Sequence, residues 1–361
     1  MMKTIFDPIM IGSIFAKNRI VRSATAEMKA DEHGRITDGY GPIFEDLAKG
    51  GTGVIITGMF GVDANSGFGG RTPNAYNENF VRDFRNLADM VHAYDCRIVV
   101  QLVHSGAKAV PEGGGAPLGP SDMTLPRAKP AKAMTKQDVE ALAESFASAA
   151  ARCKEAGADG VQIHGAHGYL ISQFLSPSTN KRTDEYGGDI VGRGRILLEM
   201  LDAMRRAVGQ DFPIWIKINC KDLVEESITL DECIWLCMEM EKRGLSAIEL
   251  SAGMGYGRDS SPSKLIKDEN DEGSFAAEAL ILAEKVDIPV ISTGGFRTPD
   301  VIESWLNKGK IEGIGLSRPL ICEPDLVLRW QGGDRKKARC ISCSGCYRAK
   351  NGYGCQAVIT D

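Results

Sequence analysis

Two of the five histidines of this 361-residue chain, His164 and His167, are only three residues apart, in the stretch HGAHGYLISQFLSPSTNKRTDEYGG. Tyr169 follows two residues later. As zinc ligands the pair would need a third partner, but no Asp or Glu stands at a usual ligand spacing and no HExxH motif is present. As structural side chains the two imidazoles would need only local hydrogen bonds. We favour a third interpretation, in which both rings donate to one substrate carbonyl oxygen and Tyr169 donates or positions a proton.

A second group of reactive side chains is close to the end of the sequence, in CISCSGCYRAKNGYGC. Cys340, Cys343, Cys346 and Cys355 give the spacing C-x2-C-x2-C-x8-C. In a reducing compartment such a run indicates a metal more than disulfides. Thiolates at this spacing bind a [4Fe–4S] cluster or structural zinc, and a metal-free remnant is the remaining interpretation. The other cysteines are scattered through apolar segments and are expected to be buried, reduced thiols: Cys96, Cys153, Cys220, Cys233, Cys237 and Cys322.

Short, nearly continuously apolar runs rich in β-branched residues recur along the chain, as expected for strands that are buried on both faces. Amphipathic stretches separate them. Eight strands alternating with helices predict a parallel sheet, and the number favours an α/β fold closed into a single (β/α)8 TIM barrel. A doubly wound open sheet is the alternative, but the GxGxxG turn that usually accompanies it is absent from the sequence. The eight runs are 20–25, 53–58, 98–104, 160–165, 213–219, 247–252, 289–295 and 313–318.

The predicted helices have recognisable ends. Thr135 and Asp138 form a capping-box pair at the start of one of them. Thr229 is expected to cap a second helix, which should stop at Gly244, and Pro299 to take the first helical position of a third. These ends set the rhythm of strand and helix that a barrel requires.

In such a barrel the chemistry lies at the C-terminal ends of the strands. Polar residues are frequent at those ends, and we expect them to converge on one mouth. Two long loops, 104–135 and 260–274, are expected to act as lids over that mouth. The polar strand-end residues are Thr25, Gln101, His104, His164, His167, Lys217, Asn219, Ser251 and Arg318.

The ends of the seventh and eighth strands form the position where this fold commonly holds a phosphate. Gly294 and Gly295 offer backbone N–H groups there, and Arg318 offers a guanidinium suited to a phosphate. With the amide of Gln101 and the cation of Lys217, they suggest a planar phosphorylated cofactor, for which flavin mononucleotide (FMN) is a good match.

Several motifs carry a resemblance to a known family. HGAHGYLISQFLSPSTNKRTDEYGG, followed by GRGRILLEML, closely resembles the signature of the old yellow enzyme family of flavin-dependent ene-reductases. FDPIMIGSIFAKNRIVRSAT resembles the opening of that family, and IVVQLVHSGAKA its third-strand motif. The resemblance covers nearly the whole chain. It implies an FMN-containing barrel in which NADH or NADPH reduces the flavin, and the flavin passes hydride to the β-carbon of an enone or enoate.

Carried over to this sequence, the resemblance gives roles to individual residues. His164 and His167 would bind the substrate carbonyl, and Tyr169 would be the proton donor to the α-carbon. Ala26 stands where relatives often have a Cys or Thr that tunes the flavin, and Met28 where some have a substrate-contacting tyrosine. The cofactor-binding residues that it implies are Ser23, Ala24, Thr25, Met59, Gln101, Lys217, Gly294, Gly295, Ser317 and Arg318.

The cysteine run is similar to one that holds a [4Fe–4S] cluster just after the barrel in 2,4-dienoyl-CoA reductase and trimethylamine dehydrogenase. The last spacing is longer in those enzymes, and a flavin- or nucleotide-binding half follows it, whereas this sequence stops at Asp361. We therefore expect an FMN-binding TIM barrel over residues 1–335 and a cysteine-rich segment over residues 336–361. A cluster without the second half would need an outside electron partner, unless direct flavin reduction bypasses it.

Other functions and partners can be weighed on the same residues. A flavin-dependent amine dehydrogenase or demethylase would not use a histidine pair, because an amine offers no oxygen to two donors; an FMN/Fe–S electron-transfer subunit is the non-enzymatic alternative. The net charge of −5 provides no basic field for nucleic acid or anionic lipid. No apolar run approaches the roughly 20 residues of a membrane span, and the N-terminus does not read as a signal peptide. We expect a cytoplasmic homo-oligomer that acts on a small molecule.

Overall fold

The computed structural model describes residues 2–67, 72–126, 128–349 and 353–357. Its centre is a closed barrel in which neighbouring strands run parallel and the last strand pairs with the first. Each strand lies at one of the predicted apolar runs, so the predicted TIM barrel is confirmed. The barrel strands are β3 (Ile20–Arg22), β4 (Val54–Gly61), β5 (Arg97–Val103), β8 (Gly160–Gly165), β9 (Ile214–Asn219), β10 (Ala247–Ser251), β11 (Val290–Ser292) and β12 (Ile311–Leu316).

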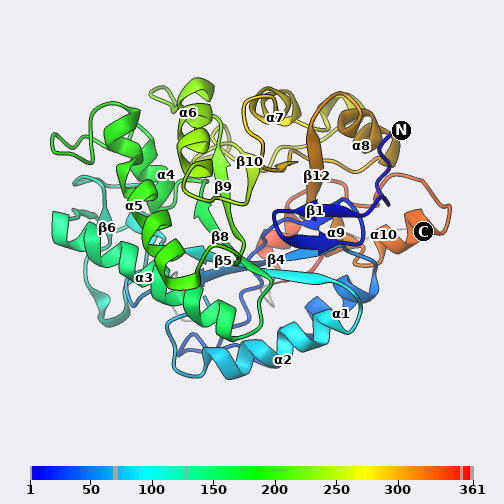
Figure 1. Cartoon of the computed structure of the whole chain (residues 1–361), viewed down its shortest axis with the longest axis horizontal. Coiled ribbons are helices and arrows are strands. Elements are labelled where there is room, and N and C mark those ends of the chain that lie inside the picture. Colours follow the sequence, from blue (N-terminus) through cyan, green and yellow to red (C-terminus); the bar gives the residue numbers. More distant parts are fainter. Residues whose placement is uncertain (1, 68–71, 127, 350–352, 358–361) are drawn as a thin grey trace.

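Helices surround the barrel (Figure 1). The Thr135–Asp138 capping box is present, and Thr229 forms a second one with Glu232. The second helix ends earlier than predicted, because Gly244 closes the turn after the helix instead of ending it. The helices are α1 (Gly41–Lys49), α2 (Phe80–His92), α3 (Lys136–Glu155), α4 (Leu170–Leu175), α5 (Ile190–Val208), α6 (Leu230–Glu241), α7 (Ala276–Ala283), α8 (Pro299–Leu306), α9 (Arg318–Cys322) and α10 (Leu326–Gln331).

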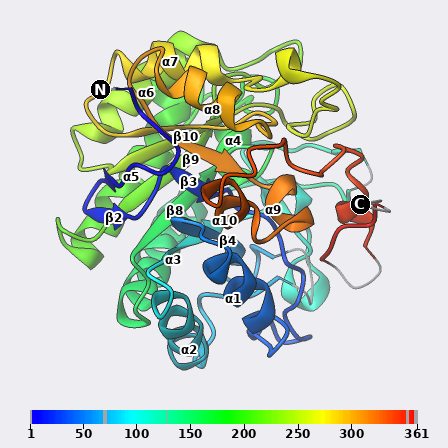
Figure 2. The ribbon, with the colours of Figure 1, turned by 90° about the vertical axis from the view of Figure 1, so that its right-hand side faces the viewer.

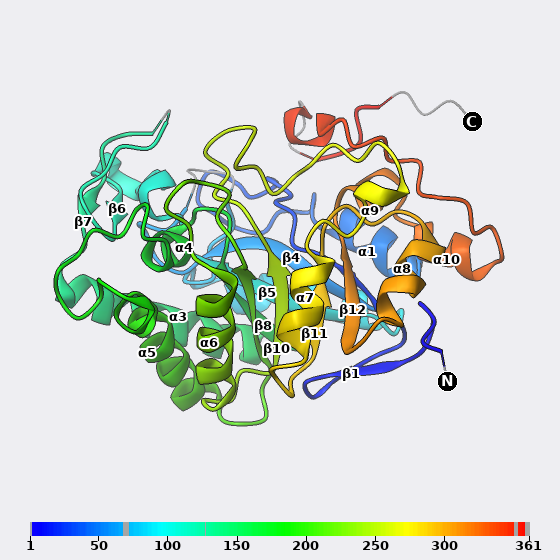
Figure 3. The ribbon, with the colours of Figure 1, turned by 90° about the horizontal axis from the view of Figure 1, so that it is seen from above.

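An antiparallel hairpin of β1 (Ile9–Ile11) and β2 (Ile14–Ala16) closes the end of the barrel that lies away from the predicted mouth (Figure 3). Its apolar side chains form one cluster with residues of the barrel interior. This end of the barrel is therefore filled with apolar side chains, which leaves the opposite end for a binding site. The interior residues of the cluster are Val21, Val54, Ile56, Val99, Trp215, Ala247 and Ile291.

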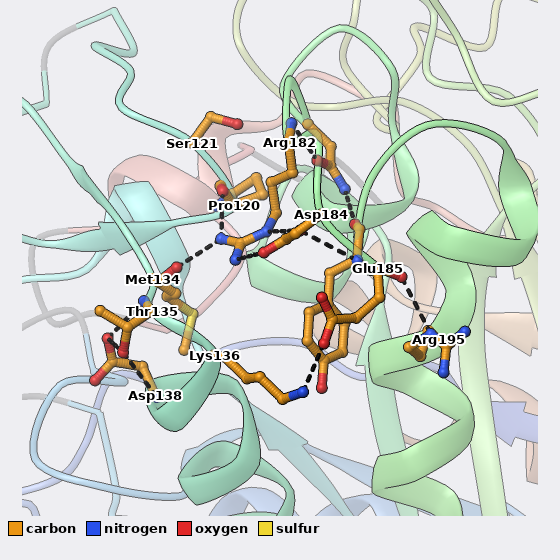
Figure 4. A network of polar contacts seen from close by, with 12 residues as sticks. Pro120, Ser121, Met134, Thr135, Lys136, Asp138, Arg182, Asp184, Glu185 and Arg195 are labelled. Carbon is orange, nitrogen blue, oxygen red and sulfur yellow. Dashed lines mark hydrogen bonds and ion pairs between the residues drawn. The ribbon is translucent and has the colours of Figure 1, made fainter.

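At the mouth, the long loop after β5 forms a flap, which we define as residues 109–134. It holds a two-stranded pairing of β6 (Leu118–Gly119) with β7 (Lys132–Ala133). Arg182, from the loop between α4 and α5, donates to the carbonyl oxygens of Pro120 at 3.0 Å and Met134 at 2.6 Å (Figure 4). Asp184 holds the same guanidinium through an ion pair of 2.5 Å. The KRTDEYGG half of the sequence motif therefore fixes the flap. Short 3-10 turns in these loops and in the C-terminal segment are η1 (Gly106–Lys108), η2 (Glu112–Gly114), η3 (Glu269–Asp271) and η4 (Gly345–Arg348).

The cysteine-rich C-terminal segment follows α10 and returns to the mouth, where it lies beside α9 (Figure 2). Figure 3 shows this segment and the flap at the same end of the barrel, on opposite sides of it. None of the helices in the described part of the chain is long and apolar enough to cross a membrane.

Candidate active site

A cavity of about 410 Å³ opens at the C-terminal ends of the barrel strands. Its volume is in the range of small-molecule sites. Every residue predicted to be catalytic or to bind the flavin lines it, so two sets of residues that were predicted separately share one site. They are Ser23, Ala24, Thr25, Met59, Gln101, His164, His167, Tyr169, Lys217, Gly294, Gly295, Ser317 and Arg318.

His164 and His167 face each other in this cavity, with ring centroids 5.4 Å apart and ring planes at 86°. The Tyr169 ring lies 4.6 Å from that of His164. The backbone N–H of Ala166 donates to Nδ1 of His164 at 3.4 Å, which leaves Nε2 to carry the proton of a neutral ring. Nε2 of His167 lies 2.7 Å from the Ser251 hydroxyl. When the Ser251 hydroxyl donates to Nε2 of His167, Nδ1 carries the proton of that ring, and each neutral imidazole then has one N–H group left for a ligand.

Both imidazoles are neutral near pH 7. Burial holds the pKa of His164 and of His167 well below the ordinary histidine value, and the cations of Lys217 and Lys108 add to this effect. A neutral imidazole has one N–H donor and one acceptor. The pair therefore suits hydrogen bonding to a substrate oxygen more than proton transfer.

His167 has a backbone conformation that non-glycine residues rarely adopt, with φ of 61°. The Oδ1 atom of Asn219 accepts a hydrogen bond from its N–H at 3.3 Å. The amide nitrogen of Asn219 donates to Asp222 and to the carbonyl of Gly253, at 3.0 and 3.1 Å. Backbone strain of this kind is kept where the surroundings fix it, often at functional sites. Asn219 thus supports His167 from behind.

Asn219 and His104 were expected at the mouth, and neither lines the cavity. His104 is buried, and its Nδ1 accepts from the N–H of Gly106 at 3.0 Å. Its Nε2 lies 3.7 Å from Asp63. Both residues are at strand ends, but their side chains turn toward neighbouring loops. That part of the prediction was wrong because position at a strand end does not fix the direction of a side chain.

A buried polar network lies at the floor of the cavity. Gln101 donates to Gln162 at 2.8 Å, and Gln162 donates to Glu249 at 2.9 Å. Glu249 pairs with Lys217 at 3.0 Å, and Lys217 also donates to Ser23 at 2.6 Å. The hydroxyl of Ser23 donates to Glu249 at 2.5 Å. Five polar side chains therefore form one continuous chain of hydrogen bonds beneath the predicted flavin face.

The sequence reasoning missed Gln162 and Glu249. Each interrupts an otherwise apolar strand, in GVQIHG and AIELSA, and both are fully buried. A buried carboxylate without a partner is costly, so an acidic residue inside a buried strand is a signal that a cation lies nearby. Here that cation is Lys217, and the carboxylate offsets part of its charge.

The opposite end of the cavity fits a phosphate. Gly294 and Gly295 have φ of 128° and 85°, and a Cβ on Gly294 would lie 2.5 Å from the backbone nitrogen of Ser274. The N–H groups of both glycines have no hydrogen-bond acceptor within the described residues. Proteins bind a phosphate through backbone N–H groups and guanidinium groups, and the N–H groups of both glycines share this cavity with Arg318. The donor set as a whole therefore fits FMN, with the phosphate at this end and the polar network near the ring.

Arg318 is shared between the cavity and the C-terminal segment. It donates to the carbonyl of Ser342 and the hydroxyl of Ser344, both at 3.2 Å, and to the carbonyl of Lys264 at 2.9 Å. Arg297, from the loop after β11, donates to the hydroxyl of Ser342. Hydrogen bonds from Arg318 and Arg297 therefore connect the phosphate end of the cavity to the cysteine-rich segment.

The four predicted metal ligands do not converge. Within the described residues, no group of three or more His, Cys, Asp or Glu side chains could hold a metal ion. Cys343 is exposed, and Cys340, Cys346 and Cys355 are half-buried. Cys322 is half-exposed, not buried as expected, and burial together with a hydrogen bond to Cys355 raises its pKa to about 12. A cluster or zinc at these cysteines stays a prediction.

Comparison with curated sequences places this geometry in a family. The profile of the NADH:flavin oxidoreductase / NADH oxidase family matches residues 4–337. The metal reductase of Desulforamulus reducens is 36% identical over 356 residues, which cover 96% of this chain and 51% of that protein. The NADPH dehydrogenase of a Geobacillus species is 34% identical over 322 residues, covering 89% and 91%. The chain spans about half the length of its longer relatives, such as the metal reductase and the NADH oxidase of Thermoanaerobacter brockii.

Two solved structures superimpose on most of this chain. A 2-naphthoyl-CoA reductase in complex with 2-naphthoyl-CoA superimposes with a TM-score of 0.87 at 26% identity, over 95% of this chain and 54% of that one. The old yellow enzyme homologue of Zymomonas mobilis shares the fold, with a TM-score of 0.78 at 23% identity over 92% and 94% of the two chains. The chain therefore belongs to the NADH:flavin oxidoreductase / NADH oxidase family, the old yellow enzyme family of FMN-dependent oxidoreductases.

Proposed function

We propose that this chain is an FMN-dependent ene-reductase, which uses NADH or NADPH to reduce the C=C bond of α,β-unsaturated carbonyl compounds. One observation carries the proposal. Two neutral imidazoles, His164 and His167, meet at a right angle in the cavity that also holds the predicted flavin-binding residues.

FMN would be held between the polar network and the phosphate end. Gly294, Gly295 and Arg318 would bind the phosphate, and Gln101 would bind the pyrimidine edge. Lys217 would lie near the part of the ring that becomes negative on reduction. Bound FMN would accept hydride from the nicotinamide and pass hydride to the β-carbon of the substrate.

The remaining steps fall to side chains of this chain. His164 and His167 would donate to the carbonyl oxygen and stabilise the negative charge that develops there. Tyr169 would supply the proton to the α-carbon. Overall, one NAD(P)H and one proton convert the unsaturated carbonyl compound to the saturated one. Both histidines stay neutral in this scheme, so neither has to transfer a proton.

Steady-state turnover tests this proposal. The FMN-loaded chain is incubated with NADH or NADPH and 2-cyclohexenone, and the product is identified. We expect cyclohexanone in one-to-one ratio with NAD(P)+. Loss of both donors in His164→Ala/His167→Ala should reduce kcat/KM by about 100-fold or more, in the range of losing oxyanion-stabilising donors. Oxidation of NAD(P)H without any saturated ketone would overturn the proposal.

The amine dehydrogenase alternative is tested separately, with an amine and the oxidised flavin. One relative, from Chromohalobacter salexigens, is named an N,N-dimethylglycine/sarcosine dehydrogenase. Incubation of the oxidised chain with sarcosine should leave the flavin spectrum unchanged. Bleaching of the flavin by sarcosine would favour amine oxidation instead.

A further inference from the structure

A second cavity, of about 1000 Å³, adjoins the proposed active site. The two cavities share Lys108, Tyr169 and Gly255 in their linings. One wall of the second cavity comes from the flap, and the opposite wall comes from the loop after β10. A substrate held beside Tyr169 could therefore extend directly into this space.

The second cavity has a positive lining in a chain whose net charge is −5. Lys108, Lys129 and Arg258 line it, and no Asp or Glu is among the described residues that do so. Lys129 and Arg258 are exposed, so they stand at the open side, whereas Lys108 lies at the junction with the active site. The three cations therefore line the second cavity from its open side to its junction with the proposed active site.

Lys108 has no carboxylate partner in the described chain. Its ammonium group donates to the carbonyl oxygens of His167 at 2.7 Å and Met254 at 2.8 Å. The same group lies 5.0 Å from the centre of the Tyr169 ring and 4.9 Å from that of Tyr256. An ammonium group has three N–H donors, so one is left after the two carbonyl bonds. A desolvated cation held by neutral groups alone is stabilised by any anion that approaches it.

The wall that carries Lys129 is held in place. Arg182 holds the flap at two points on either side of Lys129, Pro120 and Met134 (Figure 4). Lys136, just beyond the flap, pairs at 2.7 Å with Glu185, which lies on the same α4–α5 loop as Arg182. The second cavity is therefore bounded by an anchored wall, not by an unsupported loop.

We propose that the second cavity binds an anionic extension of the substrate, so that the preferred substrates are α,β-unsaturated carbonyl compounds whose tail carries phosphate or carboxylate groups. Lys129 and Arg258 attract the tail, and Lys108 contacts it where it leaves the reacting end. This inference rests on the proposed function and adds a substrate class to it.

The test compares thioesters that share one enoyl group. Crotonyl-N-acetylcysteamine is neutral, S-crotonyl-3-mercaptopropionate carries a carboxylate, and crotonyl-CoA carries phosphates. Each reoxidises the dithionite-reduced FMN enzyme under anaerobic conditions, so that no nicotinamide competes for the cavity. We expect half-saturation at about tenfold lower concentration, or less, for the anionic thioesters than for the neutral one, the scale of two or three screened charge pairs. The preferred anion identifies phosphate or carboxylate as the natural group.

The variant Lys129→Gln/Arg258→Gln should lose about tenfold in half-saturation for the anionic thioesters and leave the neutral thioester unchanged. Lys285→Gln, at an exposed lysine after α7, is the matched control and should change neither. FMN content and the melting temperature show that each variant folds. Equal half-saturation for the three thioesters in the wild type, or an equal loss for all three in the double variant, would overturn the inference.

Calorimetry separates this inference from the proposed function. Butyryl-CoA and butyryl-N-acetylcysteamine cannot be reduced further, and their binding to the oxidised enzyme needs no turnover. Tighter binding of butyryl-CoA that disappears in Lys129→Gln/Arg258→Gln would support the charged cavity even if 2-cyclohexenone failed to reoxidise the flavin, an outcome that would end the ene-reductase proposal. Equal binding of the two butyryl thioesters would end the charged-cavity inference while leaving turnover of neutral enones intact.

Discussion

At the scale of single residues, the site separates a neutral part from a charged part. His164 and His167 are kept neutral by burial and by the nearby lysines, which suits them to bind an oxygen without titrating near pH 7. Lys217 and Glu249 instead form an ion pair inside the barrel. In the proposed function, the first pair would bind the substrate and the second would set the electrostatic environment of the flavin.

The histidine pair can be tested without turnover. In the proposed site, a phenol should bind in the place of the substrate oxygen and give a long-wavelength charge-transfer band with oxidised flavin. His164→Ala/His167→Ala should abolish this band, because both N–H donors are lost, while FMN stays bound. The measurement is a phenol titration followed by absorbance, with FMN content as the control. A phenol-induced band of normal intensity in the variant would show that the donors lie elsewhere.

Glu249 should lower the midpoint potential of the flavin, because its carboxylate offsets the charge of Lys217 at 3.0 Å. Glu249→Gln keeps the shape and a hydrogen bond to Gln162 but removes the negative charge. We expect the potential to rise by on the order of 30 mV, which is about tenfold in the equilibrium constant of a two-electron couple. Glu312→Gln, at the start of β12, is the control and should leave the potential unchanged. An unchanged or lower potential in Glu249→Gln would contradict this role.

The sequence allowed most of the site to be predicted because polar residues at the ends of apolar strands are conspicuous. His164, Gln101 and Lys217 are of this kind. Gln162 and Glu249 were missed because they lie within strands, where a polar residue gains its meaning only from partners on other strands. Those partners are distant in sequence, and only closure of the barrel brings them together.

At the scale of elements, two loops of different origin make the mouth. The flap follows β5, and the clamping loop, residues 176–189, follows α4. Arg182 joins them through two backbone carbonyls, which are acceptors that no side-chain substitution in the flap can remove. The strands and helices themselves were predictable from apolar periodicity and capping residues. The clamp was not, because a guanidinium bonded to backbone carbonyls leaves no pattern in the partner sequence.

Loss of the clamp should loosen the flap selectively. In Arg182→Gln we expect faster amide exchange at Lys132 and Met134, whose N–H groups donate to the flap carbonyls of Pro117 and Gly119 at 2.9 Å. Hydrogen–deuterium exchange measures this, with the barrel strands as the internal reference. Arg195→Gln removes a hydrogen bond to the carbonyl of Glu185 and an ion pair with Glu199, neither of which reaches the flap, and serves as the control. Unchanged exchange at both amides would mean that the flap is held by other contacts.

At the scale of the whole molecule, the cysteine-rich segment is connected to the barrel through the phosphate end of the site. Arg318 and Arg297 both donate to Ser342. The pKa of Tyr353 in the same segment is raised by burial, which its hydrogen bond to the buried Arg22 partly opposes. Any metal at the cysteines would have to draw the four thiols together, since they do not converge within the described residues.

Metal analysis decides whether the segment is a cluster site. If the sequence prediction is right, the anaerobically purified chain contains iron and sulfide, with broad absorbance beneath the flavin bands. Cys343→Ser should remove the iron and the broad absorbance, since Cys343 is one of the four predicted thiolate ligands. Zinc in place of iron would support the structural alternative, and the absence of iron from the wild type would end the cluster hypothesis.

The chain spans about half of its longer relatives, so its function has to be established on the chain itself. The most direct measurement is the anaerobic reoxidation of the reduced FMN enzyme by 2-cyclohexenone, followed by flavin absorbance and product analysis. An ene-reductase should recover the oxidised flavin spectrum and form one equivalent of cyclohexanone for each flavin, and His164→Ala/His167→Ala should slow this step by about 100-fold or more. A flavin that stays reduced in the presence of 2-cyclohexenone, or that reoxidises without forming cyclohexanone, would contradict the assignment.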